Sequence, residues 1–218
     1  MAPASDMKRS PIALQGYPLI LASAVLILLG VVGHWAWITV LGLLGAGFFA
    51  YFFRDPERDI PSDPGAIISP ADGKVVLVDE VQEKEFLEST AQRVAIFMNV
   101  FDVHVNRAPV TGLVAKMQHR PGEYKAASRP DAGLRNEQQA VVLESEYGQR
   151  VLVVQIAGLL ARRIIPFVKP GQQLARGERF GMICFGSRVD VYLPPDSSIQ
   201  VKVGDRVKAG SSIIGRWA

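Results

Sequence analysis

The sequence predicts a mainly β (α+β) protein, in which an antiparallel, barrel-sandwich-like domain follows an N-terminal transmembrane helical hairpin. Three observations predict this fold class. Residues 17–53 form a long apolar run. From Ala66 onward, short apolar or alternating runs are separated by turn residues, as in antiparallel sheets. A turn of the form G-x-x-apolar-x-x-G occurs at 171–177 and again at 204–210, as in barrel-sandwich domains.

The apolar run 17–53 is too long for one membrane span and long enough for two short ones. Its only titratable side chains are two tyrosines and His34. A single span needs about 20 apolar residues. The segment 33–37, GHWAW, suits an interfacial turn, because tryptophan gathers at membrane surfaces. We therefore expect a helical hairpin.

Basic residues flank the hairpin on both sides. Lys8 and Arg9 precede the run, Arg54 and Arg58 follow it, and the turn has neither Lys nor Arg. The positive-inside rule then places both ends in the cytoplasm, with the following domain on the cytoplasmic face of the cell membrane. We expect a tail at 1–16, the hairpin at 17–53 and a second domain at 54–218.

Two other interpretations of the apolar run stay open. A secretory signal peptide would have an apolar core of only about 7–15 residues and a small-residue cleavage site. A buried helical hairpin of a soluble protein is the other. The segment 54–65 is rich in Pro and Asp and marks the domain boundary.

Composition excludes several classes of protein. With a net charge of +3 and no basic stripe, the chain does not look like a nucleic-acid-binding protein. Its single cysteine, Cys184, excludes an internal disulfide and a multi-cysteine metal site. No close cluster of ligating residues is apparent, so we expect no metal. The only histidines are His34, His104 and His119.

Polar residues at a few positions are candidates for chemistry. Gly186-Ser187 is a turn or a nucleophile; a G-x-S-x-G elbow would need glycine where Val189 stands. In a strand, His104 would share one face with Asp102 and Asn106, because side chains alternate.

Two further residues have ordinary structural explanations. Asp72, in SPADG, is typical of a turn, where aspartate hydrogen-bonds nearby backbone. His119 precedes a turn and is expected at the surface.

A lipoyl-type carrier would need a lysine at a hairpin tip, and only Met117 beside Lys116 resembles that pattern.

Taken together, the segments resemble the short form of the phosphatidylserine decarboxylase family, which is pyruvoyl-dependent. The matching segments occur in the family's order and cover nearly the whole chain. These segments are FFRDPER, ISPADGKV, FMNVFDVHVNRAPVTG, FGSRVDVYLP and VKVGDRVKAGSSIIGRW. Within them, DVHVNRAP and the FGS step are the parts most specific to the family.

The resemblance implies that the chain cuts itself between Gly186 and Ser187, giving a β chain, 1–186, and an α chain, 187–218, that stay together as a heterodimer. Ser187 would become a covalent pyruvoyl cofactor. The cofactor would form a Schiff base with phosphatidylserine and release carbon dioxide and phosphatidylethanolamine. His104 would donate the proton, and Asp72 would orient a partner or assist self-cleavage.

One position departs from the family's longer branch. There a second histidine lies three residues after the equivalent of His104 and serves as the base for self-cleavage. Here that residue is Arg107, which stays protonated and is a poor base. Either His104 does both jobs, or a water or backbone group replaces the base.

The resemblance also implies a lipid substrate at the membrane, which the apolar hairpin supports independently. From charge alone, Arg162, Arg163 and Lys169 are candidates to meet the lipid phosphate. Two other functions stay open: a pyruvoyl-dependent decarboxylase of a soluble amino acid, and a non-catalytic, membrane-anchored adaptor or carrier. The oligomeric state beyond the cleaved heterodimer is also open.

Overall fold

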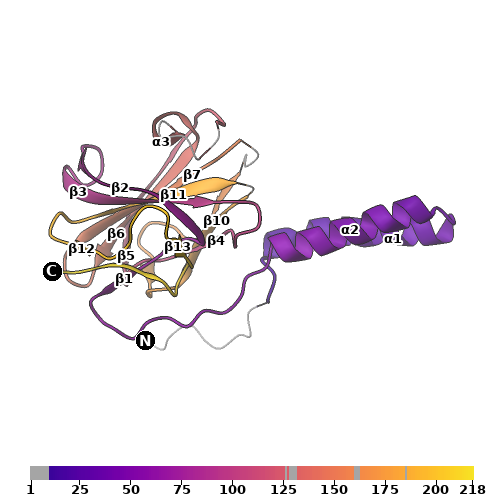
Figure 1. The fold of residues 1–218 in the computed structure, drawn as a ribbon, viewed down its shortest axis with the longest axis horizontal. Helices are drawn as coiled ribbons and strands as arrows, with labels where there is room; N and C mark the ends of the chain where they lie inside the picture. The colour runs from indigo at the N-terminus through magenta and orange to yellow at the C-terminus, as the bar shows by residue number, and fades with distance from the viewer. Residues whose placement is uncertain (1–9, 126, 128–131, 160–162, 185) are drawn as a thin grey trace. The chain divides into compact units, whose positions relative to one another are not determined.

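The structure is a computed structural model that describes residues 10–125, 127, 132–159, 163–184 and 186–218. The chain forms two compact units, Met1–Glu57 and Arg58–Ala218. The first is helical and the second is built mainly from strands (Figure 1).

The helical unit contains a short 3-10 turn, η1 (Leu14–Gly16), and two α-helices, α1 (Tyr17–Val32) and α2 (Ala36–Phe52). The helices end where the sequence predicts a break, and His34 in that break has a φ of 55°. Small residues allow close packing between the helices. A Cβ on Gly30 would lie 2.4 Å from the Thr39 hydroxyl, so the two backbones approach closely there.

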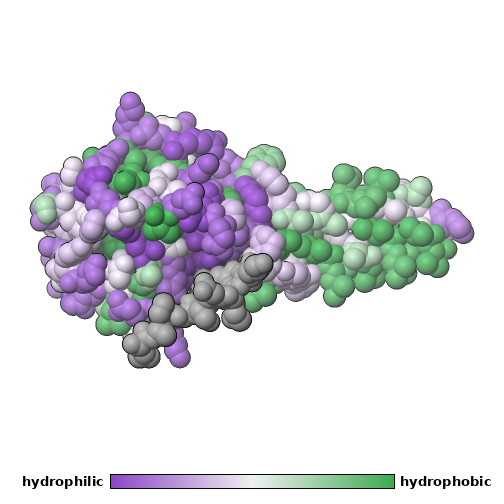
Figure 2. Space-filling view, turned by 90° about the horizontal axis from the view of Figure 1, so that it is seen from below, coloured by the Kyte–Doolittle hydropathy of each residue, from purple (hydrophilic) through white to green (hydrophobic). Residues whose placement is uncertain are grey.

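The surface of the helical unit is strongly apolar (Figure 2). Leu21 and Leu28 on α1 and Leu44 on α2 are 66%, 61% and 67% exposed. Among the described residues, Leu14–Val32 is long and apolar enough to cross a membrane, whereas Ala36–Phe52 is shorter. Exposed apolar area of this extent marks an interaction surface. Insertion as a membrane hairpin stays a prediction.

The second unit confirms the prediction of a mainly antiparallel β domain, since every pairing in its sheets is antiparallel. It also has a short helix, α3 (Ala132–Arg135). Its strands are β1 (Ala66–Ile68), β2 (Gly73–Glu83), β3 (Ser89–Met98), β4 (Val105–Arg107), β5 (Gly112–Arg120), β6 (Gln138–Ser145), β7 (Arg150–Ile156), β8 (Ile164–Pro166), β9 (Gln173–Leu174), β10 (Arg179–Ile183), β11 (Ser187–Leu193), β12 (Ser198–Ile199), β13 (Arg206–Val207) and β14 (Ile213–Arg216).

These strands form one eight-stranded sheet, ordered β13-β2-β3-β11-β7-β6-β5-β9, and two three-stranded sheets, β1-β14-β12 and β4-β10-β8. The arrangement has an internal pseudo-twofold symmetry. From the two edges of the large sheet inward, β13 corresponds to β9, β2 to β5, β3 to β6 and β11 to β7. In the small sheets, β1 corresponds to β4, β14 to β10 and β12 to β8. The centre lies where Val153 on β7 faces Val191 on β11.

The two glycine-bounded turns of the sequence are equivalent parts of these halves. Gly171, Gly177, Gly204 and Gly210 all have φ between 81° and 104°, a conformation that favours glycine. Each turn leads into an edge strand, β9 or β13, which pairs with the glycine that begins β5 or β2. The repeat is therefore a structural duplication. The name barrel-sandwich for this arrangement stays an interpretation.

The central strands of the large sheet, β6, β7 and β11, are buried on both faces. On β11, Val189, Val191 and Leu193 point into the main core. Tyr192 points the other way and packs on a second cluster with Leu152 and Val154. Because neighbouring residues of a strand alternate between faces, Ser187 lies on the main-core side and Arg188 on the other.

Candidate functional site

The Gly186-Ser187 step lies where the chain enters a central strand. Gly186 has a φ of 65°, in the left-handed region that glycine adopts at no steric cost. Ser187 is the first residue of β11 and is fully buried. It faces Met98 on β3, and its hydroxyl donates to Met98 Sδ at 3.5 Å. A glycine in the left-handed region thus precedes a hydroxyl held inside the protein.

Gly158 packs against the carbonyl group of Gly186. Ile156 pairs with Arg188, and extending this ladder by two residues brings Gly158 opposite Gly186. A Cβ on Gly158 would lie 1.8 Å from the Gly186 carbonyl oxygen and 3.3 Å from Cβ of Ala127. Position 158 therefore requires glycine for the Gly186 carbonyl to keep its place.

His104 is fully buried close to this step. Its Nδ1 lies 2.9 Å from the Asp102 carbonyl oxygen, which only accepts, so Nδ1 carries a proton. Nε2 is then the nitrogen that can exchange a proton. The backbone carbonyl of His104 accepts a bond from the Ile183 N–H at 3.3 Å, three residues before Gly186. The structure therefore brings His104 and the end of β10 together.

The prediction that Asp102, His104 and Asn106 lie on one strand face is wrong for the first two. Strand β4 begins only at Val105. The Asp102 carboxylate instead accepts a hydrogen bond from the backbone N–H of Asn99 at 2.9 Å and forms an ion pair with Arg206 at 3.2 Å. A tight turn stabilised by this carboxylate replaces the expected strand, as aspartate commonly does in turns.

Asp72 is buried in a structural turn. Its carboxylate accepts two hydrogen bonds from Arg58, at 3.0 and 2.8 Å, and the Ala209 N–H at 2.8 Å. In the other half of the duplication, the Thr111 hydroxyl accepts a hydrogen bond from the backbone N–H of Arg176 at 3.1 Å, which is equivalent to the bond from Ala209 to Asp72. These contacts support a structural role for Asp72, and a catalytic role for it stays a prediction.

Arg107, in place of the second family histidine, is also buried. Its Nη1 donates to the Gly177 carbonyl at 3.1 Å, and its Cδ lies against Gly210. Its side chain therefore lies between the ends of the two repeated turns. We interpret Arg107 as a structural residue that connects the two repeated turns.

The basic residues proposed to meet the phosphate differ in position. Arg162 lies outside the described residues. Arg163 and Lys169 are exposed, and the Arg163 carbonyl accepts the Cys184 N–H at 3.3 Å. Burial raises the pKa of the Cys184 thiol, although the Arg163 charge acts in the opposite direction. The thiol therefore stays largely protonated near neutral pH and does not compete with Ser187 as a nucleophile.

A buried ion pair directly follows Ser187 on β11. Arg188 donates from Nε and Nη2 to the two carboxylate oxygens of Asp190, each at 2.6 Å. Burial, the largest single effect, lowers the pKa of the Arg188 guanidinium, but the hydrogen bonds to Asp190 together with the charge of Asp190 and the influence of Tyr192 give a net rise of that pKa. Gly133 on α3 covers the pair, since a Cβ there would lie 2.9 Å from Nη2. This pair holds the strand behind Ser187 in place.

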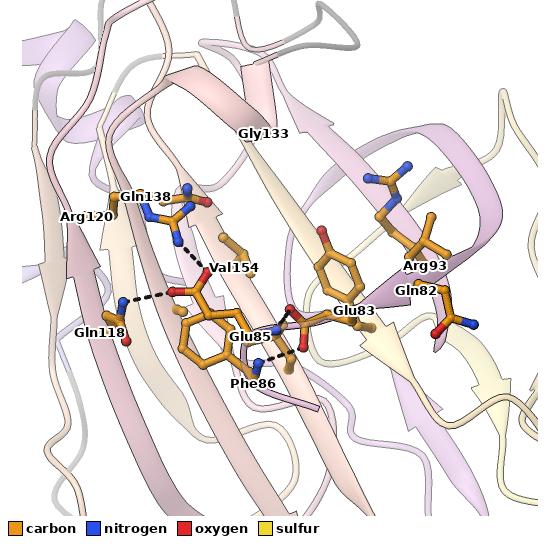
Figure 3. A pocket seen from close by; sticks show the side chains of 14 residues that line it. Gln82, Glu83, Glu85, Phe86, Arg93, Gln118, Arg120, Gly133, Gln138 and Val154 are labelled. Carbon is orange, nitrogen blue, oxygen red and sulfur yellow. Dashed lines mark hydrogen bonds and ion pairs between the residues drawn. The ribbon is translucent and has the colours of Figure 1, made fainter. Parts of the chain in front are cut away.

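A cavity of about 230 Å³ lies further along the same face of the sheet (Figure 3). Phe86, Leu152 and Tyr192 contribute its apolar walls. Its charged groups have partners within the chain: Glu85 pairs with Arg120, Arg93 pairs with Asp79, and the Glu83 carboxylate accepts the backbone N–H of Phe86. The described lining includes none of the predicted site residues. The cavity is therefore separate from the Ser187 hydroxyl, which faces the main core.

Sequence reasoning did not single out three features around Ser187. They are Gly158, the Arg188–Asp190 pair, and the buried amide of Gln155, which donates to Asn106. Alternation along SRVD could have indicated that Arg188 and Asp190 share a face. No local pattern indicates Gly158 or Gln155, because both are brought to Ser187 by pairing between β7 and β11.

Comparisons with known proteins identify the family of the chain. The family model described as phosphatidylserine decarboxylase matches residues 46–215. The phosphatidylserine decarboxylase proenzyme of Symbiobacterium thermophilum is 49% identical over 97% of this chain and 98% of its own length. The proenzymes of Nitrosomonas europaea and Desulfotalea psychrophila are 46% and 44% identical, over 94% of this chain and 95% and 96% of theirs. With matches that span almost its whole length, the chain belongs to the phosphatidylserine decarboxylase family.

Proposed function

We propose that this chain cleaves itself at Gly186–Ser187 and then decarboxylates phosphatidylserine to phosphatidylethanolamine. The observation that carries the proposal is the step from a left-handed glycine to a buried serine at the head of a central strand. Family membership supports the substrate and the overall reaction.

Self-cleavage uses groups of this chain. The Ser187 hydroxyl gives up its proton and Oγ attacks the Gly186 carbonyl carbon. The peptide C–N bond breaks, and the nitrogen takes the proton, so an ester replaces the amide. Loss of the Ser187 α-proton and cleavage of the Cβ–Oγ bond then release the Gly186 carboxylate. Addition of one water and loss of one ammonia leave a ketone at position 187.

Residues around the step fit a pyruvoyl group made in place. Of the described residues other than its chain neighbours, none has an atom within 4 Å of a Cβ placed on Gly186, so its Cα is open on that side. Ser187 is buried, which keeps bulk water from a reactive ester. The ketone supplies an electrophile for the substrate amine and accepts the electron pair left when carbon dioxide departs. His104 Nε2 is the proposed source of the proton that replaces the carboxylate.

The two products of cleavage stay paired. In the sheet, β11 begins the α chain and lies between β3 and β7 of the β chain. Later strands β13 and β14 pair with β2 and β1. The α chain thus contributes strands to one half of the duplication, and ladders on both sides of β11 hold it. This arrangement supports a heterodimer that survives loss of the covalent bond.

A membrane position suits a diacyl substrate, which does not leave the bilayer readily. The apolar helices α1 and α2 are proposed to insert as a hairpin, with both ends in the cytoplasm by the positive-inside rule. Arg163 and Lys169 are exposed cations proposed to meet the lipid phosphate, together with Arg162 of the sequence.

Intact mass of the purified chain under denaturing conditions tests self-cleavage. We expect two chains, with the smaller one beginning at position 187 and lighter by one ammonia than the same peptide starting with serine. The reason is that elimination leaves position 187 lighter than serine by one water, because Oγ departs with the Gly186 carboxylate. Hydrolysis then adds one water and releases one ammonia, so the net loss is one ammonia. A single uncut mass in folded protein would contradict the proposal and favour the non-catalytic adaptor.

The substrate is tested on the same cleaved protein. Carbon dioxide release is measured from phosphatidylserine in mixed micelles and from free serine at equal concentration. We expect release from the lipid alone. Equal or greater release from serine would favour a decarboxylase of a soluble amino acid.

Substitution of Gly158 by alanine is expected to slow self-cleavage roughly a hundredfold, because displacement of a reacting group by about 1 Å has effects of this size. The new Cβ cannot remain 1.8 Å from the Gly186 carbonyl oxygen, so the attacked carbonyl must move. The measurement is the fraction of cut chain over time after synthesis in a cell-free system.

Gly65→Ala is the matched control for Gly158→Ala. A Cβ at Gly65 would have only Asp63 Oδ1 nearby, at 3.7 Å, which is an ordinary contact. We expect this variant to be cut at the wild-type rate. If Gly158→Ala is cut equally fast, the Gly186 carbonyl does not depend on Gly158 for its position.

A further inference from the structure

A pair of hydrogen-bonded amides lies inside the main core beside Ser187. Asn106 on β4 and Gln155 on β7 are both 0% exposed. Gln155 Nε2 donates to Asn106 Oδ1 at 2.8 Å. Asn106 Nδ2 in turn donates to Met98 Sδ at 3.7 Å, the same sulfur that accepts the Ser187 hydroxyl at 3.5 Å. The amide of Asn106 and the hydroxyl of Ser187 thus share one neighbouring atom.

The hydrogen bond from Gln155 orients the Asn106 amide. A thioether sulfur can only accept, so the favourable group to face Met98 is the NH₂ of Asn106. With its oxygen bound by Gln155, Asn106 directs its donors toward Met98, whose sulfur also accepts the Ser187 hydroxyl. Gln155 lies opposite Val189, two residues along the strand from Ser187 and on the same face. The pair therefore lies on the same side of the sheet as the Ser187 hydroxyl and shares Met98 with it.

The internal duplication provides a comparison for this pair within the same molecule. Asn106 pairs with Gly181, and Gln155 packs on that glycine, with Nε2 3.0 Å from the position of a Cβ. In the other half, Ile67 pairs with Gly215, and Leu193 packs on that glycine at 3.5 Å. Ile67 and Leu193 are also 0% exposed. The fold therefore accepts an apolar pair at this position.

The amide pair is also costly to bury. Gln155 Oε1 is buried and has no hydrogen-bond partner among the described residues. A buried acceptor without a partner destabilises the folded chain, whereas an apolar pair of similar shape does not. The half of the molecule that contains Asn106 is the half whose small sheet, β4-β10-β8, leads directly into Gly186 and Ser187. The pair is thus placed for chemistry rather than for packing.

We propose that Asn106 donates a hydrogen bond to Ser187 Oγ during self-cleavage and that Gln155 positions Asn106 for this task. The inference rests on the proposed self-cleavage. Oγ gains negative charge twice: when the hydroxyl loses its proton and attacks Gly186, and when the Cβ–Oγ bond breaks and Oγ leaves as part of the Gly186 carboxylate. A fixed donor beside Oγ stabilises both states. It does not act as the base.

The decisive experiment is the double variant Asn106→Ile with Gln155→Leu, which replaces the amide pair by the residues found at the equivalent positions of the other half, Ile67 and Leu193. No unpaired amide remains, so we expect thermal stability at or above that of the wild type. Self-cleavage, followed by intact mass over time after cell-free synthesis, should slow by on the order of a hundredfold, the usual effect of losing one such donor. A double variant that is stable and cut at the wild-type rate would overturn the inference.

Asn106→Asp is the second variant, chosen to keep the shape of the side chain. Its carboxylate still accepts from Gln155, but the donor facing Ser187 is gone. We expect slowed cleavage here too. Gln155→Leu alone should also slow cleavage, and it should add nothing when Asn106 is already isoleucine, because it acts through Asn106. Additive effects of the two substitutions would contradict the positioning role of Gln155.

Gln138→Leu is the matched control, because Gln138 is a buried glutamine of the neighbouring strand β6 that lines the cavity on the other face. It should be cut at the wild-type rate. Cleavage of the wild type distinguishes failure of the proposed self-cleavage from failure of the proposed role of Asn106. If the wild type stays uncut, the proposed function fails; if it is cut and the double variant is cut equally fast, only the role of Asn106 fails.

Discussion

Replacement of Ser187 by alanine should leave one uncut chain with no decarboxylase activity. Alanine has no Oγ to attack the Gly186 carbonyl. The Ser187 hydroxyl makes one weak bond, to Met98 Sδ, so folding should change by less than about 1 kcal/mol. Intact mass, thermal unfolding and carbon dioxide release from phosphatidylserine measure the three properties.

Ser197→Ala is the control for this change. Ser197 is another buried serine of the α chain, 7% exposed, ten residues after Ser187. This variant should be cut normally and should keep full activity. If Ser187→Ala is cut at position 186 or retains activity, the nucleophile is a different group and the assignment of the pyruvoyl position is wrong.

Replacement of His104 by glutamine should lower turnover by a factor of roughly 10² to 10⁴, the range expected for loss of a general acid. Glutamine keeps a polar group of similar length but cannot transfer a proton at neutral pH. The bond from Nδ1 to the Asp102 carbonyl leaves Nε2 as the nitrogen that exchanges protons. Turnover must be expressed per mole of pyruvoyl-bearing α chain, so that slower self-cleavage is not counted as lost catalysis.

The two roles open to His104 give different results in this experiment. Slow formation of the α chain together with low turnover would indicate that His104 also serves as the base for self-cleavage, in place of the histidine that Arg107 replaces. His119→Gln is the control, because His119 has a side chain that is 51% exposed. It should leave both rates unchanged. Full turnover per pyruvoyl in His104→Gln would remove His104 from the mechanism.

The duplication places self-cleavage at a junction in the fold. Strands β4 to β10 form one half, and β1 to β3 together with β11 to β14 form the other. Gly186–Ser187 joins the end of β10 to the start of β11, where the chain leaves one half and returns to the other. Because β11 is paired on both sides, breaking this connection costs no strand pairing. The proposed cut therefore lies at a connection whose loss removes no strand pairing.

Much of the fold could be predicted from local patterns. The apolar run 17–53, its break after Gly33, and the antiparallel strands follow from hydrophobicity and turn residues, which act over a few positions. The repeated glycine turns at 171–177 and 204–210 were visible for the same reason, since a positive φ favours glycine wherever it occurs. The expected strand through Asp102 failed because that carboxylate binds the backbone of its own turn.

The class of fold, the Gly186-Ser187 step and the resemblance to a family could all be read from residues close together in the chain. The surroundings of the predicted site residues depend instead on how the strands pair and pack. The tertiary structure placed Gly158 against the Gly186 carbonyl, Asp72 on Arg58, and the amides of Asn106 and Gln155 near Ser187. These contacts join strands far apart in sequence, and the register of strand pairing, which sets them, depends on the packing of the whole core.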